Sequence, residues 1–415
     1  MFHWFSVLTT KERKTLYACF GGWALDALDT QLYSFLIPTL VAAWNINHTQ
    51  AGFLGTSALI SSSVGGWLAG ILCDRIGRVR VMQIAIFWFV LFTLLSGFCN
   101  SYEQLLATRI LSGIGFGGEW AAGSVLMGEI IRAEYRGKAV GTVQSAYAIG
   151  YAVAALMSSA LFGMFADDIA WRAMFWIGVS PAIIVFMMLR HVTEPDVFLA
   201  ARKEKASTGK ADASPFAIFH PAILRTTILT SLLALGIQGG AFAMIIWLPT
   251  YLKTMWHLST VDVGYNMFVF TAGSFFGYIA SAYLCDSIGR RRNFLFFVAL
   301  CWAAIPAFLY IHGSPAFLLV LQFVLGFGML GIYSALGPYF TELFPTAIRA
   351  SGQGFAYNFG RAFGAFFPTI VGILNGAVLP FRESIAVMAL GSYAFVVLSI
   401  ALLPETKGRE LDKIS

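Results

Sequence analysis

The chain has few charged residues for its length. Only 12% of its 415 residues are Asp, Glu, Lys or Arg, whereas a soluble globular domain averages about 25%. Hydrophobic residues make up 58% of the chain. So few charges cannot cover the surface of a water-soluble protein of this size. The composition therefore excludes a soluble globular protein and indicates an all-α protein that crosses a membrane many times.

Cysteines are also scarce, and they follow no pattern. The five thiols are scattered, odd in number and lack the short spacings of a metal site. We therefore expect no disulfide, no metal ion and no cofactor. The stretch from Gly113 to Gly118 fits a dinucleotide-binding pattern, but it lies in an apolar run with no preceding strand, so it indicates close helix packing instead. No nucleophile–base constellation stands out, which argues against an enzyme.

What the chain does contain is a series of apolar runs, each long enough to span a bilayer as a helix of about 20 residues. They predict twelve transmembrane helices in two six-helix halves, residues 1–190 and 224–415, joined by a hydrophilic connector at 191–223. The predicted spans are residues 15–42, 51–72, 80–98, 103–128, 138–163, 172–190, 224–251, 262–284, 293–312, 315–340, 350–374 and 382–403.

The net charge of +6 suits nucleic acid, but its distribution argues for a membrane. Of the 27 Lys and Arg residues, 22 fall in the leader, the connector, the tail and alternate loops. The remaining loops hold only Arg172, Lys253 and Arg382. Because basic loops stay in the cytoplasm, we expect both termini to be cytoplasmic, the protein to lie in the inner membrane, and no nucleic-acid partner.

Each half contains the same short basic turn. Residues 70–80 and 282–292 share Cys, Asp, Ile, Gly and Arg at an offset of 212, and Gly77 and Gly289 allow a sharp reversal. Further matches along the chain keep offsets of 211 to 213. A repeat in the same direction predicts two halves related by an axis along the membrane normal, with the binding site between them.

Ionisable residues within the predicted spans are costly, so they mark candidate functional sites. Asp26 and Asp29 lie three residues apart on one helix face, and Arg109 is a natural partner for either carboxylate. We expect them to form the proton-coupling group, with Asp29 favoured as the residue that titrates. Arg109 alternatively reaches solvent at the membrane edge. Glu119 is either a second proton site or a structural anchor.

Arg361 is the clearest cation within the apolar body of the second half. Its guanidinium suits a carboxylate ligand, so we expect it to anchor an anionic substrate, with a structural ion pair as the alternative. Other side chains of the substrate site are polar or aromatic residues that could equally be core residues. These candidates are Tyr33, Gln144, Gln238, Tyr333 and Asn358.

The repeated turn resembles the signature loop of the major facilitator superfamily. Three further motifs resemble its organic-acid proton symporters: Asp26-x-x-Asp29, the run from Arg109 to Trp120, and residues 337–345 with 357–361. Ala27 stands where the aromatic-acid carriers usually have Gly, which favours the sialate/lactate families. The resemblance implies a gate made of Asp74, Arg75, Arg78, Glu129, Arg136, Asp286, Arg290, Glu342 and Arg349.

We therefore expect a secondary active transporter that carries an organic acid anion, a monocarboxylate, sialate or similar, together with a proton. Alternating access would move both, and the protein would work as a monomer in the lipid bilayer. An aromatic-acid symporter and a sugar or polyol carrier of the same superfamily are the alternatives. A membrane sensor that binds without moving its ligand is a rival from another class.

The charge distribution makes the topology testable. A cysteine introduced at Arg202 in the connector should react with an impermeant thiol reagent only after the membrane is permeabilised. A cysteine introduced at Lys253, in a predicted outside loop, is the matched control and should react in intact cells. Labelling of the connector in intact cells would contradict the topology.

Overall fold

A computed structural model describes residues 3–46, 48–208, 214, 216–311 and 313–411, so part of the connector lies outside the described residues. The described residues form α-helices and short 3-10 turns, with no strand among them. The helices of the first half are α1 (His3–Ser6), α2 (Thr10–Trp44), α3 (His48–Ile76), α4 (Arg78–Ser96), α5 (Tyr102–Ile130), α6 (Arg136–Met164), α7 (Asp167–Gly178) and α8 (Pro181–Leu189).

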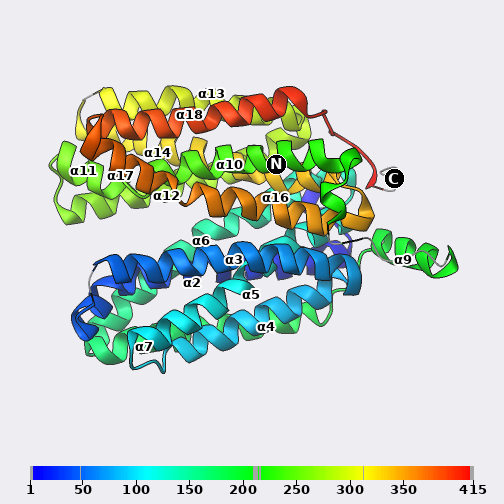
Figure 1. The fold of residues 1–415 in the computed structure, drawn as a ribbon, viewed down its shortest axis with the longest axis horizontal. Helices are drawn as coiled ribbons and strands as arrows, with labels where there is room; N and C mark the ends of the chain where they lie inside the picture. The colour runs from blue at the N-terminus through cyan, green and yellow to red at the C-terminus, as the bar shows by residue number, and fades with distance from the viewer. Residues whose placement is uncertain (1–2, 47, 209–213, 215, 312, 412–415) are drawn as a thin grey trace.

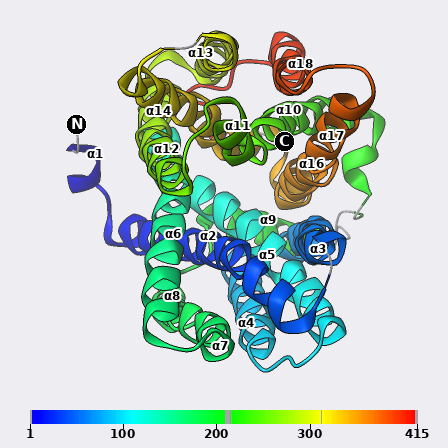
Figure 2. The same ribbon diagram turned by 90° about the vertical axis from the view of Figure 1, so that its left-hand side faces the viewer.

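The connector contains α9 (Asp196–Thr208), which projects from one end of the molecule (Figure 1). The helices of the second half are α10 (Pro221–Ile245), α11 (Leu248–Met255), α12 (Thr260–Ile288), α13 (Arg290–Tyr310), α14 (Pro315–Gly331), α15 (Leu336–Leu343), α16 (Arg349–Gly364), α17 (Phe367–Ala377) and α18 (Phe381–Leu402). Both views show helices α2–α8 gathered on one side and α10–α18 on the other (Figures 1 and 2).

The predicted twelve spans correspond to twelve rods. In the described part of the chain, nine helical stretches are long and apolar enough to cross a membrane. The three rods that complete the set are α2, α5 and the pair α16–α17. These three carry the predicted intramembrane charges, which lower their hydropathy. The fold therefore places the predicted intramembrane charges on these three rods.

Four predicted spans differ from the structure because each is a broken rod rather than one continuous helix. The run at 172–190 is divided into α7 and α8, with Pro181 opening α8, and Pro249 and Pro368 stand in the first turns of α11 and α17. Proline lacks the N–H that would continue the preceding helix, which explains these three breaks. The fourth run passes from α14 to α15 through a 3-10 turn at Ile332–Ala335.

Glycines let neighbouring helices touch through their backbones. A methyl group at Gly117 of α5 would overlap the carbonyl oxygen of Ser62 on α3, and one at Gly277 of α12 would overlap that of Phe327 on α14. The glycine-rich stretch in α5 therefore packs helices, as the sequence predicted. The same device in both halves reflects the repeat.

The two repeated turns lie at one end of the molecule, here called the basic end. Gly77 and Gly289 adopt φ values of 111° and 98°, which confirms the predicted reversals. A side chain at either position would be strained in this region of backbone conformation. The turns start α4 and α13 with an arginine as the first helical residue, Arg78 and Arg290.

Candidate functional site between the halves

Two glutamates at the basic end are each held by arginines from both halves. Glu129 accepts from Arg78 of its own half at 2.9 Å and from Arg349 of the other half at 2.6 Å. We call these three residues the first gate cluster. All three side chains are buried, so the ion pairs are shielded from water.

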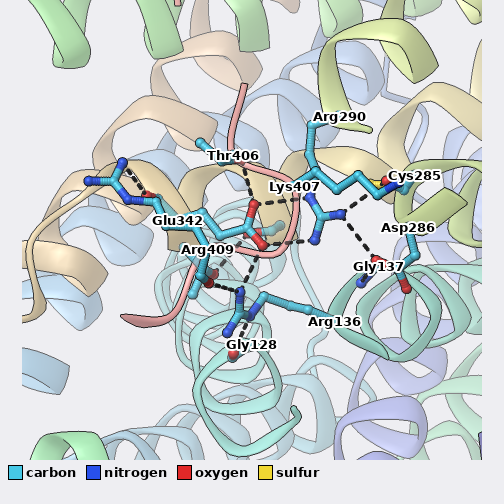
Figure 3. A network of polar contacts seen from close by, with 12 residues as sticks. Gly128, Arg136, Gly137, Cys285, Asp286, Arg290, Glu342, Thr406, Lys407 and Arg409 are labelled. Carbon is cyan, nitrogen blue, oxygen red and sulfur yellow. Dashed lines mark hydrogen bonds and ion pairs between the residues drawn. The ribbon is translucent and has the colours of Figure 1, made fainter. Parts of the chain in front are cut away.

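The second gate cluster repeats this arrangement with the halves exchanged. Glu342 accepts at 2.8 Å both from Arg290 of its own half and from Arg136 of the other half (Figure 3). Arg136 also donates to the carbonyl oxygens of Gly128 and Arg409. The structure thus brings six of the predicted gating residues into two related clusters.

The aspartates of the repeated turns hold helix starts in the opposite half. Asp74 accepts from the backbone N–H groups of Ala350 and Ser351 at 3.2 and 2.8 Å. Asp286 accepts from Gly137 and Lys138 at 2.9 and 2.8 Å. A carboxylate at a helix N-terminus meets unpaired N–H groups and the positive end of the helix dipole. Each aspartate therefore joins its own half to the start of a helix in the other half through two backbone hydrogen bonds.

Arg75 is placed differently from the other predicted gating residues. Its side chain is exposed and makes no ion pair with any residue in the described ranges. The repeat has Ser287 at the equivalent position, also exposed. This position is therefore a solvated part of the turn in both halves.

Sequence reasoning missed two glutamates that secure the turns. Glu194 accepts from the backbone N–H groups of Arg78 and Val79 at 2.8 and 3.0 Å. Glu405 accepts from those of Arg290 and Arg291 at 2.9 and 3.0 Å. Partial burial raises the pKa of Glu405, but these donors outweigh it and hold the pKa below its ordinary value. The two glutamates are 211 positions apart, which is an offset of the internal repeat. Matching the two halves at this offset would have identified them from the sequence.

Further into the bundle, Asp29 and Arg109 form a buried ion pair. Arg109 Nη1 lies 2.8 Å from Asp29 Oδ2, and Thr93 donates to the other carboxylate oxygen at 3.1 Å. The guanidinium also lies over the ring of Tyr33, 5.5 Å from its centroid. The predicted partnership of Arg109 with an aspartate of α2 is therefore formed, and it joins three helices of the first half.

Asp26 faces a different partner from Asp29. Its side chain is within hydrogen-bonding reach of Glu119 on α5, and the exposed fractions of the two residues are 1% and 3%. Glu119 Oε1 lies against Gly22, where a methyl group would overlap it. The predicted pair of aspartates is thus divided between an ion pair with Arg109 and a contact between two carboxyl groups.

Arg361 reaches across the interface from α16. Its Nη1 is 3.5 Å from Ser62 Oγ, and its guanidinium lies over the rings of Phe116 and Tyr357, 4.7 and 5.2 Å from their centroids. It is 6% exposed and forms no ion pair at contact distance with a described residue. Asp26 and Glu119 are near enough for electrostatic attraction. The cation is therefore buried, stacked on aromatic rings and without a direct counter-ion.

Two aromatic rings stack between the halves beside Arg361. Trp120 of α5 and Tyr357 of α16 have ring centroids 3.5 Å apart and an interplanar angle of 17°. Trp120 donates its ring N–H to Gln144 at 3.3 Å, and Gln238 donates to the Tyr357 carbonyl at 2.7 Å. Two of the predicted lining residues therefore orient the stack.

The remaining predicted lining residues also lie in the interior. Asn358 donates to the carbonyl of Gly354 at 2.9 Å, while its side-chain oxygen has no partner among the described residues. Tyr333 is buried and close enough to Arg361 and Tyr357 for electrostatic interaction. Tyr33 instead lies against the guanidinium of Arg109.

Polar contacts between the halves are confined to one part of the interface. Among the described residues, hydrogen bonds joining the halves run from the basic end to the Arg361–Ser62 contact and no further. Arg361 lies twelve residues from the start of α16, which is roughly 18 Å along a helix. The interface is therefore bonded from the basic end to about the middle of the bundle.

The chain is similar to known proteins in both its sequence and its fold. The family model of the Major Facilitator Superfamily matches residues 19–280 and 251–414. The chain is 40% identical to a probable 4-methylmuconolactone transporter of Cupriavidus pinatubonensis, covering 100% of this chain and 95% of that protein. It is 31% identical to a cis,cis-muconate transport protein of Acinetobacter baylyi, covering 84% of both chains. Its fold is similar to the proton:xylose symporter XylE, with a TM-score of 0.80, 19% identity and 98% coverage of each chain.

The gate clusters predict how the closed interface can be weakened without loss of the fold. Arg349→Gln removes the bond across the interface but leaves Glu129 paired with Arg78 in its own half. Breaking a buried pair costs up to about 3–5 kcal/mol when the remaining charge has no partner, and less when one stays. We expect the population open at the basic end to rise by about tenfold, which corresponds to about 1.4 kcal/mol.

The measurement is double electron–electron resonance between spin labels on the two halves at the basic end. Arg136→Gln should give the same shift, because the second cluster repeats the first. Arg75→Gln, which removes a solvated arginine of the turn, is the matched control. Unchanged distances in both cluster variants would contradict a gating role.

Proposed function

Because this chain belongs to the Major Facilitator Superfamily of transporters, we propose that it carries a small organic acid anion together with a proton. Two halves, residues 1–190 and 224–415, would move against each other as a monomer in the inner membrane. The site at their interface would then face one side of the membrane at a time.

The observation that carries this proposal is the environment of Arg361. The guanidinium is buried at the interface, lies over the rings of Phe116 and Tyr357, has a long hydrogen bond to Ser62, and forms no ion pair at contact distance with a described residue. A buried cation without a direct counter-ion favours an anionic ligand, and a guanidinium binds a carboxylate through two parallel hydrogen bonds. A neutral sugar would not satisfy this charge, so the site favours an acid over a sugar or polyol.

The rings beside Arg361 favour a flat, unsaturated acid. Trp120 and Tyr357 stack across the interface, and Trp23 and Tyr147 continue the aromatic wall on the first half. Aromatic side chains bind planar conjugated groups through their faces. The relatives named for 4-methylmuconolactone and cis,cis-muconate transport such acids according to their names. We therefore favour a small unsaturated carboxylate over sialate or lactate.

The distribution of inter-half contacts supports a carrier closed at the basic end. We propose that this end faces the cytoplasm, because it holds the arginine-rich turns and α9. Both termini would then be cytoplasmic, and the structure would be a state closed to the cytoplasm. Opening requires the two gate clusters and the Asp74 and Asp286 contacts to break together.

Proton coupling is part of the proposal because buried acids lie beside the anion site. Asp26, Asp29 and Glu119 are all buried in the first half. Their counterparts in the second half, Ile237 and Gly240 for the two aspartates, carry no charge. An acid that gains a proton when an anion binds would make uptake of the two ligands interdependent.

The function is tested by uptake into proteoliposomes. We expect accumulation of labelled 4-methylmuconolactone under an inwardly directed proton gradient, with xylose and sialic acid as matched neutral and non-planar probes. Equal uptake of xylose would favour the sugar carrier. No transport of any carboxylate in an unsaturated-acid panel would overturn the proposed function.

Arg361 provides the residue-level prediction. Arg361→Ala should weaken binding of the acid by more than tenfold, because losing a buried charge-assisted contact costs about 2–5 kcal/mol. Arg361→Lys keeps the charge but loses the planar fork, so it should fail as well. Isothermal titration of purified protein measures both effects.

Arg382→Ala is the matched control for Arg361. This arginine also lies over an aromatic ring, that of Tyr310, 5.4 Å from its centroid, but it stands at the start of α18. The Arg382→Ala variant should bind the acid with the affinity of the unaltered protein. Normal affinity in Arg361→Ala would show that the anion is anchored elsewhere.

A further inference from the structure

We propose that Asp26 and Glu119 hold one shared proton and, with Arg361, form a charge-balanced site that takes up a second proton when a monocarboxylate binds. This inference rests on the proposed function for its substrate and deepens it by assigning the proton site. It replaces Asp29, which the sequence alone favoured, with a pair of carboxyl groups on α2 and α5.

The geometry of the pair requires a proton. Asp26 and Glu119 are within hydrogen-bonding reach of each other, and two carboxylates cannot hydrogen bond unless one carries hydrogen. Asp26 Oδ2 and Glu119 Oε2 are buried and have no hydrogen-bond partner among the described residues. Two negative charges this close in a low-dielectric interior repel strongly, so the pair holds one proton rather than none.

The surroundings keep Glu119 in this position. Its Oε1 lies in the space left by the missing side chain of Gly22, and the Met82 methyl group closes the space from α4. The acid therefore points at α2 and not toward a basic partner in its own half. A buried acid without an ion pair lowers the stability of the fold, so an acid in such a position indicates a function.

Asp29 is unsuited to the same role in this state. It forms an ion pair with Arg109 and accepts a second hydrogen bond from Thr93. Both oxygens of the Asp29 carboxyl group are therefore engaged, whereas Asp26 Oδ2 and Glu119 Oε2 have no hydrogen-bond partner among the described residues. Asp29 and Arg109 also neutralise each other, so they add no net charge to the site.

Five other titratable groups face Asp26 and Glu119, and only one of them, Arg361, brings an unpaired charge. They are Asp29 and Cys19 on α2, Tyr147 on α6, and Tyr357 and Arg361 on α16. Thiols and phenols are neutral near pH 7 in ordinary surroundings. Arg361 is therefore the one net charge that opposes the pair within this group.

Charge balance then links the proton to the anion. Without substrate, the singly protonated pair carries one negative charge and Arg361 one positive charge, so the site is neutral. When a carboxylate binds Arg361, the pair loses its counter-ion and a second proton neutralises it. Loaded and empty sites are both neutral, so each monocarboxylate moves with one proton and no net charge crosses the membrane.

The shared proton is tested first without substrate. Infrared spectroscopy of purified protein at neutral pH should show a protonated-carboxyl C=O stretching band, and the double variant Asp26→Asn with Glu119→Gln should lack that component. Asp262→Asn with Glu103→Gln, two exposed acids in the first turns of α12 and α5, is the matched control. A spectrum unchanged in the D26N/E119Q double variant would overturn the shared proton whether or not an acid is transported.

The coupling is tested in proteoliposomes with 4-methylmuconolactone. A gradient of about one pH unit should drive about tenfold accumulation by the unaltered protein, independent of an imposed membrane potential. The double variant should still exchange substrate, which shows that it is folded. Its accumulation should no longer follow the pH gradient and should instead follow the membrane potential, because the anion now moves without a proton.

The single variants separate a shared site from a single essential acid. Asp26→Asn and Glu119→Gln each leave one carboxyl group to neutralise, so both should remain coupled, with a shifted pH dependence. Loss of coupling in either single variant, or pH-driven accumulation at the unaltered level in the double variant, would overturn the proposal. Failure of the unaltered protein to transport any acid would instead remove the proposed function and leave the infrared result standing.

Discussion

The structure depends on how charge is neutralised in a protein interior that water does not reach. Every buried arginine at the basic end has a carboxylate at contact distance, and each gate glutamate is shared by two arginines from different halves. An unpaired charge there would cost several kcal/mol. The arginines and glutamates that join the halves would therefore be unstable without each other. If the halves moved apart, water or other charged groups would have to replace these partners.

The residues of the two clusters recur in both halves, whereas the charged residues in the interior of the bundle do not. The gate is built twice, because its residues belong to the repeat, and even the capping glutamates Glu194 and Glu405 recur at the repeat offset. The candidate site is built once. Asp26, Glu119 and Arg361 come from three helices, and the counterparts of Asp26 and Arg361 are Ile237 and Ala148. The two clusters are therefore symmetric between the halves, while the candidate site places its acids and its cation on opposite sides of the interface.

Much of the architecture could be predicted because it depends on local sequence. Apolar runs give spans, basic loops give orientation, and a glycine with positive φ between two helices gives the reversals at Gly77 and Gly289. The broken rods were missed because the interruptions fall inside otherwise apolar runs. Pro181 and Pro368 were visible, but proline is common enough in membrane helices that it does not by itself mark a break.

The sequence by itself determined that this chain is a duplicated membrane protein, and it placed acids within the predicted spans of the first half and Arg361 within a predicted span of the second. These properties follow from composition, period and repeat, which need no knowledge of contacts. Only the tertiary structure decided that Arg109 pairs with Asp29 while Asp26 faces Glu119. The reason is that Asp26 and Asp29 lie almost one turn apart on α2, so a small difference in direction gives them different neighbours across helix contacts. Such neighbours are set by packing between helices distant in the chain, which no local pattern records.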